Sequence, residues 1–151
     1  MSFIGIARSR RSCRAFSSEP IGPEEKALIL EAGRLAPSSR NRRPVTLVPV
    51  DDVPTIRALA GCRDSNPALE SCAFAIAVTA DPSRADTWIE DASIASIMMQ
   101  MEAEDLGLGS CWIQVRMRDR AGESSEEIVR GILGIPPSEA VLSIIAVGRR
   151  P

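Results

Sequence analysis

Two short polar segments, one on each side of an expected helix, hold the residues best equipped for chemistry. Residues 10–14 place three guanidiniums and a hydroxyl within five positions, and residues 36–41 contain two serines and an asparagine after a proline. Guanidiniums bind phosphate oxygens in planar, bidentate fashion, and a turn of hydroxyls and amides can hydrogen-bond a polar heterocycle. Together the segments predict a site for a ligand with an anionic end and a heterocyclic end.

Each segment also has a plainer interpretation. Residues 10–14 could be a solvated basic helix end, and residues 37–41 could be an ordinary turn after a helix. A third segment, residues 107–114, could let the backbone approach a flat ring with Trp112 as a wall. Alternatively, it is a helix end that enters a buried strand, with Cys111 and Trp112 as core residues. The residues alone leave these alternatives open.

The amino-acid composition excludes most other kinds of catalytic and metal site. The 151-residue chain has no histidine and no tyrosine, which excludes Ser-His-Asp and Cys-His triads and imidazole metal ligands. Any redox or transfer chemistry would then come from a bound cofactor. The four cysteines, Cys13, Cys62, Cys72 and Cys111, lack CxxC spacing. For at least three of them we expect free thiols in a reducing cytoplasm, and their spacing predicts no metal site.

The net charge and the hydropathy of the chain limit the classes of partner that it could bind. The formal net charge of −2 gives no broad basic surface for nucleic acid. No apolar stretch is long enough for a signal peptide or a membrane span. With 44% hydrophobic residues, we expect one soluble, cytoplasmic domain over residues 1–151 with no nucleic-acid or membrane partner.

Helix and strand signals alternate along the chain. Helices are expected at residues 2–9, 23–35, 55–60, 86–106 and 124–133, and strands at residues 45–50, 74–78, 110–115 and 141–147. Pro23 suits the first helical position and Pro37 ends that helix. Pro49 indicates an edge strand. Ser124 and Glu127 have the spacing of a capping box.

The long helix has two unusual features. Residues 94–101 are apolar on most sides, which predicts either burial nearly all round or contact with a partner subunit. Its last turn carries Glu102, Glu104 and Asp105 at the negative pole of the helix dipole. Arginines are expected nearby to relieve that charge.

The order of these motifs resembles the nitroreductase family of FMN-dependent oxidoreductases. An R-R-S-x-R-x-F opening stands at residues 10–16 and an A-P-S-S-x-N turn at residues 36–41. A long helix follows with Asp91 near its start. G-L-G-S-C-W-I stands at residues 107–113, G-I-P at residues 134–136, and the last strand ends in V-G. The match covers nearly the whole chain.

The resemblance implies an α+β fold, a three-layer α/β/α sandwich with a central mixed, mainly antiparallel sheet. It also implies a homodimer with FMN at the subunit interface. In the implied ping-pong cycle, NADH or NADPH reduces the flavin, and the flavin reduces a small conjugated acceptor such as a nitroaromatic or a quinone. Alternatives are a flavin carrier or sensor without efficient turnover, or a cofactor-free interaction domain with the same fold.

The resemblance also implies a set of cofactor-binding residues. Those for the FMN phosphate and ribityl chain are Arg10, Ser12 and Arg14, with Arg11 alongside. Those for the isoalloxazine ring are Pro37, Ser38 and Ser39, with Asn41 supporting the turn. Those for the opposite face are Ser110, Cys111, Trp112 and Gln114, with a backbone N–H near Gln114 reaching the flavin N5. Asn66 would meet the pyrimidine edge. No side chain is needed as a proton donor, because the protein supplies position and electrostatics.

The chain departs from the family pattern at three places. The family usually continues N-x-Q-P-W, whereas residues 41–45 read N-R-R-P-V. Arg43 therefore puts a charge where an amide often meets the flavin, and it could stabilise the anionic reduced flavin. Met98 stands where related helices often carry asparagine. Relatives usually extend past the last strand with a basic residue on the phosphate. Either Arg149 takes that role here or the phosphate site is weaker.

Overall fold

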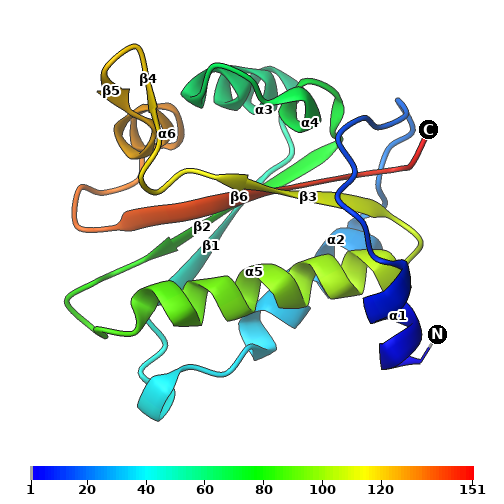
Figure 1. Ribbon diagram of the computed structural model, residues 1–151, viewed down its shortest axis with the longest axis horizontal. Helices are drawn as coiled ribbons and strands as arrows, with labels where there is room; N and C mark the ends of the chain where they lie inside the picture. The colour runs from blue at the N-terminus through cyan, green and yellow to red at the C-terminus, as the bar shows by residue number, and fades with distance from the viewer. Residues whose placement is uncertain (1) are drawn as a thin grey trace.

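One four-stranded sheet organises the chain. The computed structural model describes residues 2–151, and Figure 1 shows the sheet between two layers of helices. The strand order is β1 (Val45–Val50), β2 (Phe74–Ala80), β6 (Ala140–Gly148), β3 (Gly109–Gln114). All three pairings are antiparallel, and an isolated bridge between Ser12 and Ser110 adds a parallel contact. The predicted mixed, mainly antiparallel sheet is confirmed.

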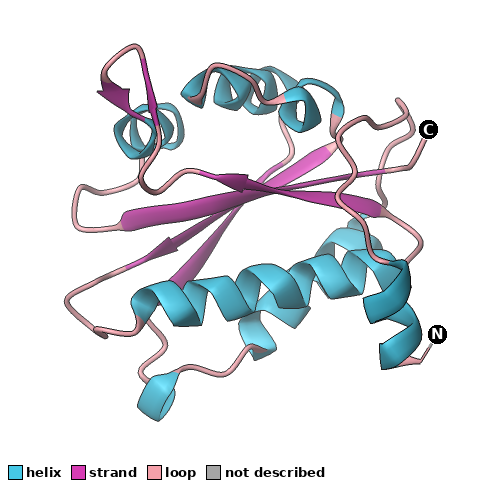
Figure 2. Cartoon of the chain, viewed as in Figure 1, coloured by secondary structure: helices cyan, strands magenta, loops and turns pink. Residues whose placement is uncertain are grey.

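Helices cover both faces of the sheet (Figures 1 and 2). One layer contains α1 (Phe3–Ser9), α2 (Pro23–Leu35) and α5 (Trp88–Asp105), and the other contains α3 (Val53–Leu59), α4 (Pro67–Ser71) and α6 (Ser125–Leu133). Each interface has its own apolar core. Ile29, Ile76 and Met99 are fully buried on the first side, and Ile56 and Ile144 on the second. The expected three-layer α/β/α sandwich is confirmed.

Local sequence signals correctly predict both ends of two elements. The predicted helix at residues 23–35 and strand at residues 45–50 have those bounds in the structure. The carboxylate of Glu25 accepts the Gly22 N–H at 2.8 Å and so caps α2. The hydroxyl of Ser2 accepts the Gly5 N–H at 3.2 Å and caps α1. Pro49 lies on the edge strand β1, as predicted.

Other local predictions were wrong or incomplete. α4, the 3-10 turn η2 (Ala60–Cys62) and the hairpin of β4 (Asp119–Arg120) and β5 (Glu123–Ser124) were not predicted. The capping box at Ser124 does not form, because the Ser124 side chain makes no cap hydrogen bond. Instead Ser124 pairs with Asp119 in the hairpin. Gly134 ends α6 in the left-handed conformation, with φ of 65°.

α5 is buried on one side only. Ala92, Ala95 and Met99 are buried, whereas Ile94, Ile97 and Met98 are 38%, 40% and 37% exposed. Burial nearly all round is therefore wrong, and the outer face of α5 remains uncovered in the single chain. No helix within residues 2–151 is long and apolar enough to span a membrane.

The acidic end of α5 has the arginine that its charge requires. Arg150 forms an ion pair with the buried carboxylate of Glu104, as predicted from the crowding of acids at the negative pole of the helix dipole. Partial burial raises the pKa of the neighbouring Glu102, and the nearby charges of Asp105 and Glu31 raise it further. Arg150 thus stabilises the negative charge of one of the three acids.

Gly33 and Gly131 form a matched pair for a stability test. A Cβ on Gly33 would lie 2.7 Å from Leu47 Cδ1 and 2.8 Å from Met99 Cγ, whereas one on Gly131 would meet no atom within 4 Å. We expect Gly33→Ala to lower the free energy of unfolding by about 1–3 kcal/mol through overpacking. Gly131→Ala should raise it by roughly 0.5–1 kcal/mol through helix propensity. Urea unfolding measures both, and equal stabilisation would contradict the packing at Gly33.

Candidate functional site

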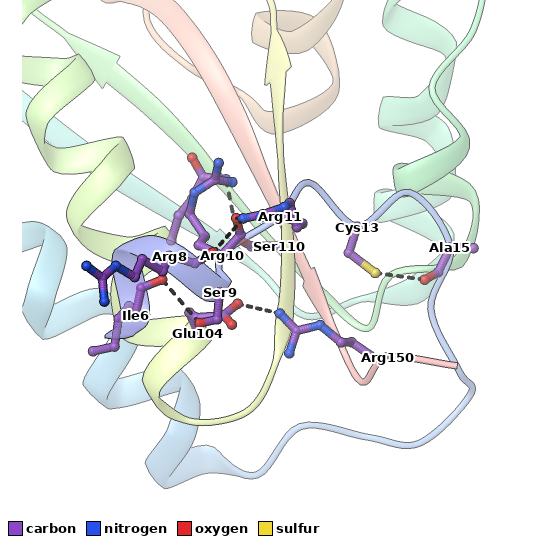
Figure 3. A network of polar contacts seen from close by, with 11 residues as sticks. Ile6, Arg8, Ser9, Arg10, Arg11, Cys13, Ala15, Glu104, Ser110 and Arg150 are labelled. Carbon is purple, nitrogen blue, oxygen red and sulfur yellow. Dashed lines mark hydrogen bonds and ion pairs between the residues drawn. The ribbon is translucent and has the colours of Figure 1, made fainter. Parts of the chain in front are cut away.

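The arginine segment, residues 10–14, is attached to the open edge of β3. The Cys13 N–H donates to the Ser110 carbonyl at 2.8 Å, next to the bridge between Ser12 and Ser110. Figure 3 shows the segment leaving α1 and passing beside this strand. The extended backbone here replaces a missing neighbouring strand over a short length.

Two glycines make this attachment possible. Gly109 and Gly148 are directly paired across β3 and β6. A Cβ on Gly148 would lie 2.7 Å from the ring of Phe16, and one on Gly109 would lie 2.8 Å from Cys13 Cβ. Phe16 is buried against these positions. The close approach that Gly109 permits is therefore made by the protein's own chain.

The three arginines of the segment differ in availability. The Arg11 guanidinium donates at 2.8 Å to the carbonyls of Arg8 and Arg10, at the end of α1 (Figure 3). The guanidiniums of Arg10 and Arg14 make no hydrogen bond or ion pair within residues 2–151. Arg14 and the hydroxyl-bearing Ser12 are exposed. Free guanidiniums beside a hydroxyl suit an anionic group such as a phosphate.

A cavity of about 190 Å³, the edge cavity, lies next to this segment. Its walls are Arg14, Arg63, Ser65, Asn66, Pro67, Ala68, Cys111, Trp112 and Ile113. The structure thus brings together four residues predicted from the sequence: Arg14, Asn66, Cys111 and Trp112. Arg63 was not predicted, because a lone arginine in a loop carries no local signal for a site.

The backbone of β3 faces the edge cavity with free donors. The carbonyls of Ser110 and Gln114 accept from Cys13 and, at 3.4 Å, from Arg63, so both point away from β6. Alternate residues of an antiparallel edge strand direct their N–H and C=O groups the same way. The N–H groups of Trp112 and Gln114 therefore point outward too. The residue at which a backbone donor was predicted, Gln114, thus has its N–H group on the outer side of the edge strand.

Side chains at these positions serve other purposes. Ser110 is buried, and its hydroxyl accepts from the Gln100 amide at 3.3 Å. The Trp112 indole donates to the Gln114 side chain at 2.9 Å, and its ring packs against the core on the α5 side. The core interpretation of the Trp112 ring is confirmed, and the residue also lines the edge cavity.

Asn66 offers one acceptor to the edge cavity. The residue is 4% exposed, and its amide nitrogen donates to the Ala60 carbonyl at 2.9 Å. Its amide oxygen accepts no hydrogen bond from the described residues, yet it is not a buried atom without a partner. The oxygen is therefore accessible at the cavity wall.

The second cavity, of about 410 Å³, lies beside the turn at residues 37–43 and is called the turn cavity. Its walls are Gly33, Arg34, Ala36, Pro37, Ser38, Arg43, Val45, Thr46, Leu47, Asp91 and Ala95. The turn includes η1 (Ser39–Asn41). Arg40, Asn41 and Arg43 all have positive φ, at 52°, 54° and 52°. Such backbone costs energy for residues other than glycine and persists only where other contacts hold it.

Asp91 supplies one of those contacts. Its Oδ1 accepts the Ser39 N–H at 3.0 Å, and its Oδ2 accepts the Thr87 hydroxyl at 3.2 Å. The residue is 3% exposed. This buried carboxylate fixes the turn to the first turn of α5. Sequence reasoning did not include it in the site, because an aspartate near a helix start is ordinary.

Arg43 supplies the others. Its N–H donates to the Ser38 hydroxyl at 3.0 Å, and its guanidinium donates to the Arg34 carbonyl at 2.9 Å and to Asn41 Oδ1 at 2.9 Å. A weaker bond of 3.3 Å reaches the Ala36 carbonyl. The cation thus caps the carbonyl end of α2, where a positive charge is favoured. Asn41 supports the turn through this bond.

Arg149 is also paired within the chain. Its guanidinium donates to the Glu25 carboxylate at 2.8 Å. The hydrogen bond from the Gly22 N–H and the pairing with Arg149 hold the pKa of Glu25 below its usual range, against a smaller effect of burial. The Ser17 N–H donates to the Arg149 carbonyl at 2.9 Å, which keeps this residue beside the chain that follows the arginine segment.

The two cavities do not meet within one chain. No described residue lines both. In Figure 1 the cyan turn lies by the start of α5 and the blue arginine segment lies near its end. A helix of 18 residues spans roughly 27 Å. The residues predicted for one site therefore form two separate groups in the single chain.

Comparisons with known proteins agree with this fold. The family model described as the nitroreductase family matches residues 7–62 and 59–149. A relative in Archaeoglobus fulgidus, provisionally named NADH dehydrogenase/NAD(P)H nitroreductase, is 33% identical over 144 residues, which are 93% of this chain and 80% of that protein. The NADPH-flavin oxidoreductase of Vibrio harveyi is 29% identical over 93% of this chain and 62% of its own length.

A solved structure extends the comparison. The FMN-dependent nitroreductase of Clostridium difficile R20291 superposes with a TM-score of 0.94 and 38% sequence identity. The superposition covers 97% of this chain and 87% of that one. The fold described above is therefore the fold of that protein over almost the whole length of the chain.

Asp91→Ala tests whether the buried carboxylate holds the turn. Removing it leaves the Ser39 N–H without its acceptor, and we expect the free energy of unfolding to fall by about 1–3 kcal/mol in urea. Asp86→Ala is the matched control, because the Asp86 side chain is 91% exposed and should change stability by less than about 0.5 kcal/mol. Equal effects of the two substitutions would show that Asp91 does not hold the turn.

Proposed function

We propose that this chain, which belongs to the nitroreductase family, is an FMN-dependent NAD(P)H oxidoreductase. It would pass electrons in a ping-pong cycle to a small conjugated acceptor such as a nitroaromatic or a quinone. One observation carries the proposal: the free guanidiniums of Arg10 and Arg14 adjoin an open strand edge whose N–H groups border the edge cavity. The proposed compartment is the cytoplasm, where the four free thiols stay reduced.

The donor set in this region fits FMN. A terminal phosphate near neutral pH carries roughly −1.5 to −2 charge, and Arg10, Ser12 and Arg14 would hold it through charge-assisted hydrogen bonds. The outward N–H groups of Trp112 and Gln114 would meet acceptor atoms of the heterocycle. Arg11 and Arg149 already donate within the chain, so we assign them a supporting positive charge and no direct contact.

The chain's own contribution is position and charge. Bound FMN would supply the two-electron chemistry, taking a hydride from the nicotinamide and delivering it to the acceptor. The protein has no histidine or tyrosine to act as an acid or base. The N–H groups on the β3 edge would stabilise negative charge that develops on the heterocycle.

We further propose a homodimer that unites the two groups of site residues. The turn with Pro37, Ser38 and Ser39 cannot reach the edge cavity of its own chain, so it would complete that of a second copy. The uncovered apolar face of α5, with Ile94 and Ile97, supports this arrangement. The same helical layer exposes further apolar side chains: Leu28 and Leu35 on α2, and Phe3 and Ile4 on α1.

Anaerobic titration of the purified protein tests the proposed function. The protein should be yellow or take up added FMN, and NADH or NADPH should bleach the flavin absorbance. Addition of an acceptor such as a quinone should restore it. A colourless protein that takes up no FMN would contradict the proposal. A flavin that neither nucleotide bleaches would instead identify a carrier or sensor.

Arg10→Ala and Arg14→Ala test the phosphate assignment. Each charge-assisted hydrogen bond contributes on the order of 1.5–3 kcal/mol, so each substitution should raise the Kd of FMN about tenfold or more. Arg118→Ala is the matched control, because that exposed guanidinium donates only to its neighbour's carbonyl among the described residues. Fluorescence titration measures the three affinities, and unchanged binding by the first two variants would refute the assignment.

Ile97→Glu tests the dimer. A carboxylate on the uncovered face of α5 would be desolvated in the interface, and we expect a monomer in light scattering together with loss of bound FMN. Val53→Glu is the control, because Val53 is 49% exposed on α3, on the other side of the sheet. A monomeric wild-type protein, or a dimer that tolerates Ile97→Glu, would contradict this interface.

A further inference from the structure

Two of the four free cysteines stand on adjacent chains at the edge of the sheet. Cys13 belongs to the arginine segment and Cys111 to β3. Each follows directly after a residue of the bridged pair, Ser12 and Ser110. Because the chains are parallel at this bridge, the two cysteines are the next neighbours across the edge.

The two side chains also share one face of the sheet. Cys13 Cβ and Sγ would lie 2.8 and 2.9 Å from a Cβ on Gly109. Gly109 and Cys111 are alternate residues of β3 and therefore face the same side. Both cysteines pack in the core cluster that contains Phe16. At the bridge that directly precedes both cysteines, the chains are joined by the hydrogen bond from the Cys13 N–H to the Ser110 carbonyl at 2.8 Å. Strands joined in this way lie about 4.8 Å apart, and a disulfide requires a Cα separation of roughly 4.4–6.8 Å.

The two thiols differ in accessibility. Cys13 is half-buried, whereas Cys111 is only 6% exposed. Burial raises the pKa of the Cys111 thiol, and the nearby charges of Arg14 and Arg10 partly oppose this effect. An oxidant from solvent therefore reacts with Cys13 first, while the buried thiol of Cys111 remains reduced.

We propose that Cys13 and Cys111 form a hydroperoxide-sensitive thiol pair that closes into a disulfide and locks the arginine segment to β3. The Cys13 sulfur attacks one peroxide oxygen, the O–O bond breaks, and a sulfenic acid and one water form from hydrogen peroxide. The Cys111 sulfur then attacks the Cys13 sulfur. The S–O bond breaks, and the departing hydroxide leaves as water with the Cys111 proton. Two thiols are oxidised and one hydrogen peroxide is reduced to two waters.

The cross-link would act on the segment that carries the free guanidiniums. Cys13 now donates its S–H to the Ala15 carbonyl at 3.0 Å (Figure 3), and that contact is lost when the sulfur turns toward Cys111. Arg14 directly follows Cys13, so its guanidinium moves with the cross-link. The pair would thereby couple exposure to peroxide to the presentation of Arg14.

Peptide mapping tests the pair without reference to any cofactor. The purified, fully reduced chain is treated with one equivalent of hydrogen peroxide, alkylated and digested with trypsin. We expect residues 12–14 joined to residues 85–116, at the summed mass less two hydrogens. Free thiols should fall from four to two. A reductant should separate the two peptides and restore the four thiols.

Variants decide whether the linkage is specific. Cys62→Ser is the matched control and should form the same linked peptide, because Cys62 is fully buried elsewhere in that core. Cys13→Ser and Cys111→Ser should form none, and Cys111→Ser should retain a sulfenic acid that dimedone traps on Cys13. A disulfide from Cys13 to Cys62 or Cys72, or between two chains, would overturn the proposal. Irreversible oxidation of Cys13 in the wild type without any linked peptide would also overturn it.

Discussion

The absence of side chains at Gly109 and Gly148 is the constraint on which the arrangement of the site depends. These glycines are opposite each other on β3 and β6. The Phe16 ring occupies the space that a Cβ on Gly148 would need, and Cys13 occupies most of the space that a Cβ on Gly109 would need. Phe16 in turn keeps residues 10–14 along the edge of β3, where the free guanidiniums adjoin the edge cavity. The glycines in this motif thus permit the path of the neighbouring chain, and the position of the candidate site depends on that path.

The edge strand β3 directs its side chains into the core and its outward backbone groups toward the edge cavity. Its side chains fill the two apolar cores, as Trp112 and Ile113 show, while its outward N–H groups remain free for a partner. Such an edge normally invites pairing with another chain. Here one bridge, at Ser12, blocks part of the edge, and the rest borders a cavity. A site built largely from backbone has little signature in side-chain types, so the sequence predicts the candidate site only through motif order.

Local structure was predictable where the signal and its effect lie within one turn. Pro23 and Glu25 begin α2 at the predicted residue, and Gly134 ends α6. The contacts that hold the candidate site were not predictable, because they join distant residues: Ser39 with Asp91, 52 positions apart, and Glu25 with Arg149, 124 apart. The failed capping box at Ser124 has the same origin, since a hairpin partner took precedence over a local pattern.

The arginines show why residue type alone could not define the anion site. Arginine side chains have several uses in this chain. The guanidiniums of Arg11 and Arg43 cap helix ends, and those of Arg149 and Arg150 neutralise carboxylates. A guanidinium that already donates to a carbonyl or pairs with a carboxylate has fewer donors left for a phosphate. The cluster of arginines in residues 10–14 therefore suggests more phosphate-binding groups than the structure provides. Only those guanidiniums whose N–H donors have no partner within the chain are available to a phosphate. Arg10 and Arg14 retain their donors within residues 2–151, while at the nearby acidic end of α5 it is Arg150 that pairs with Glu104.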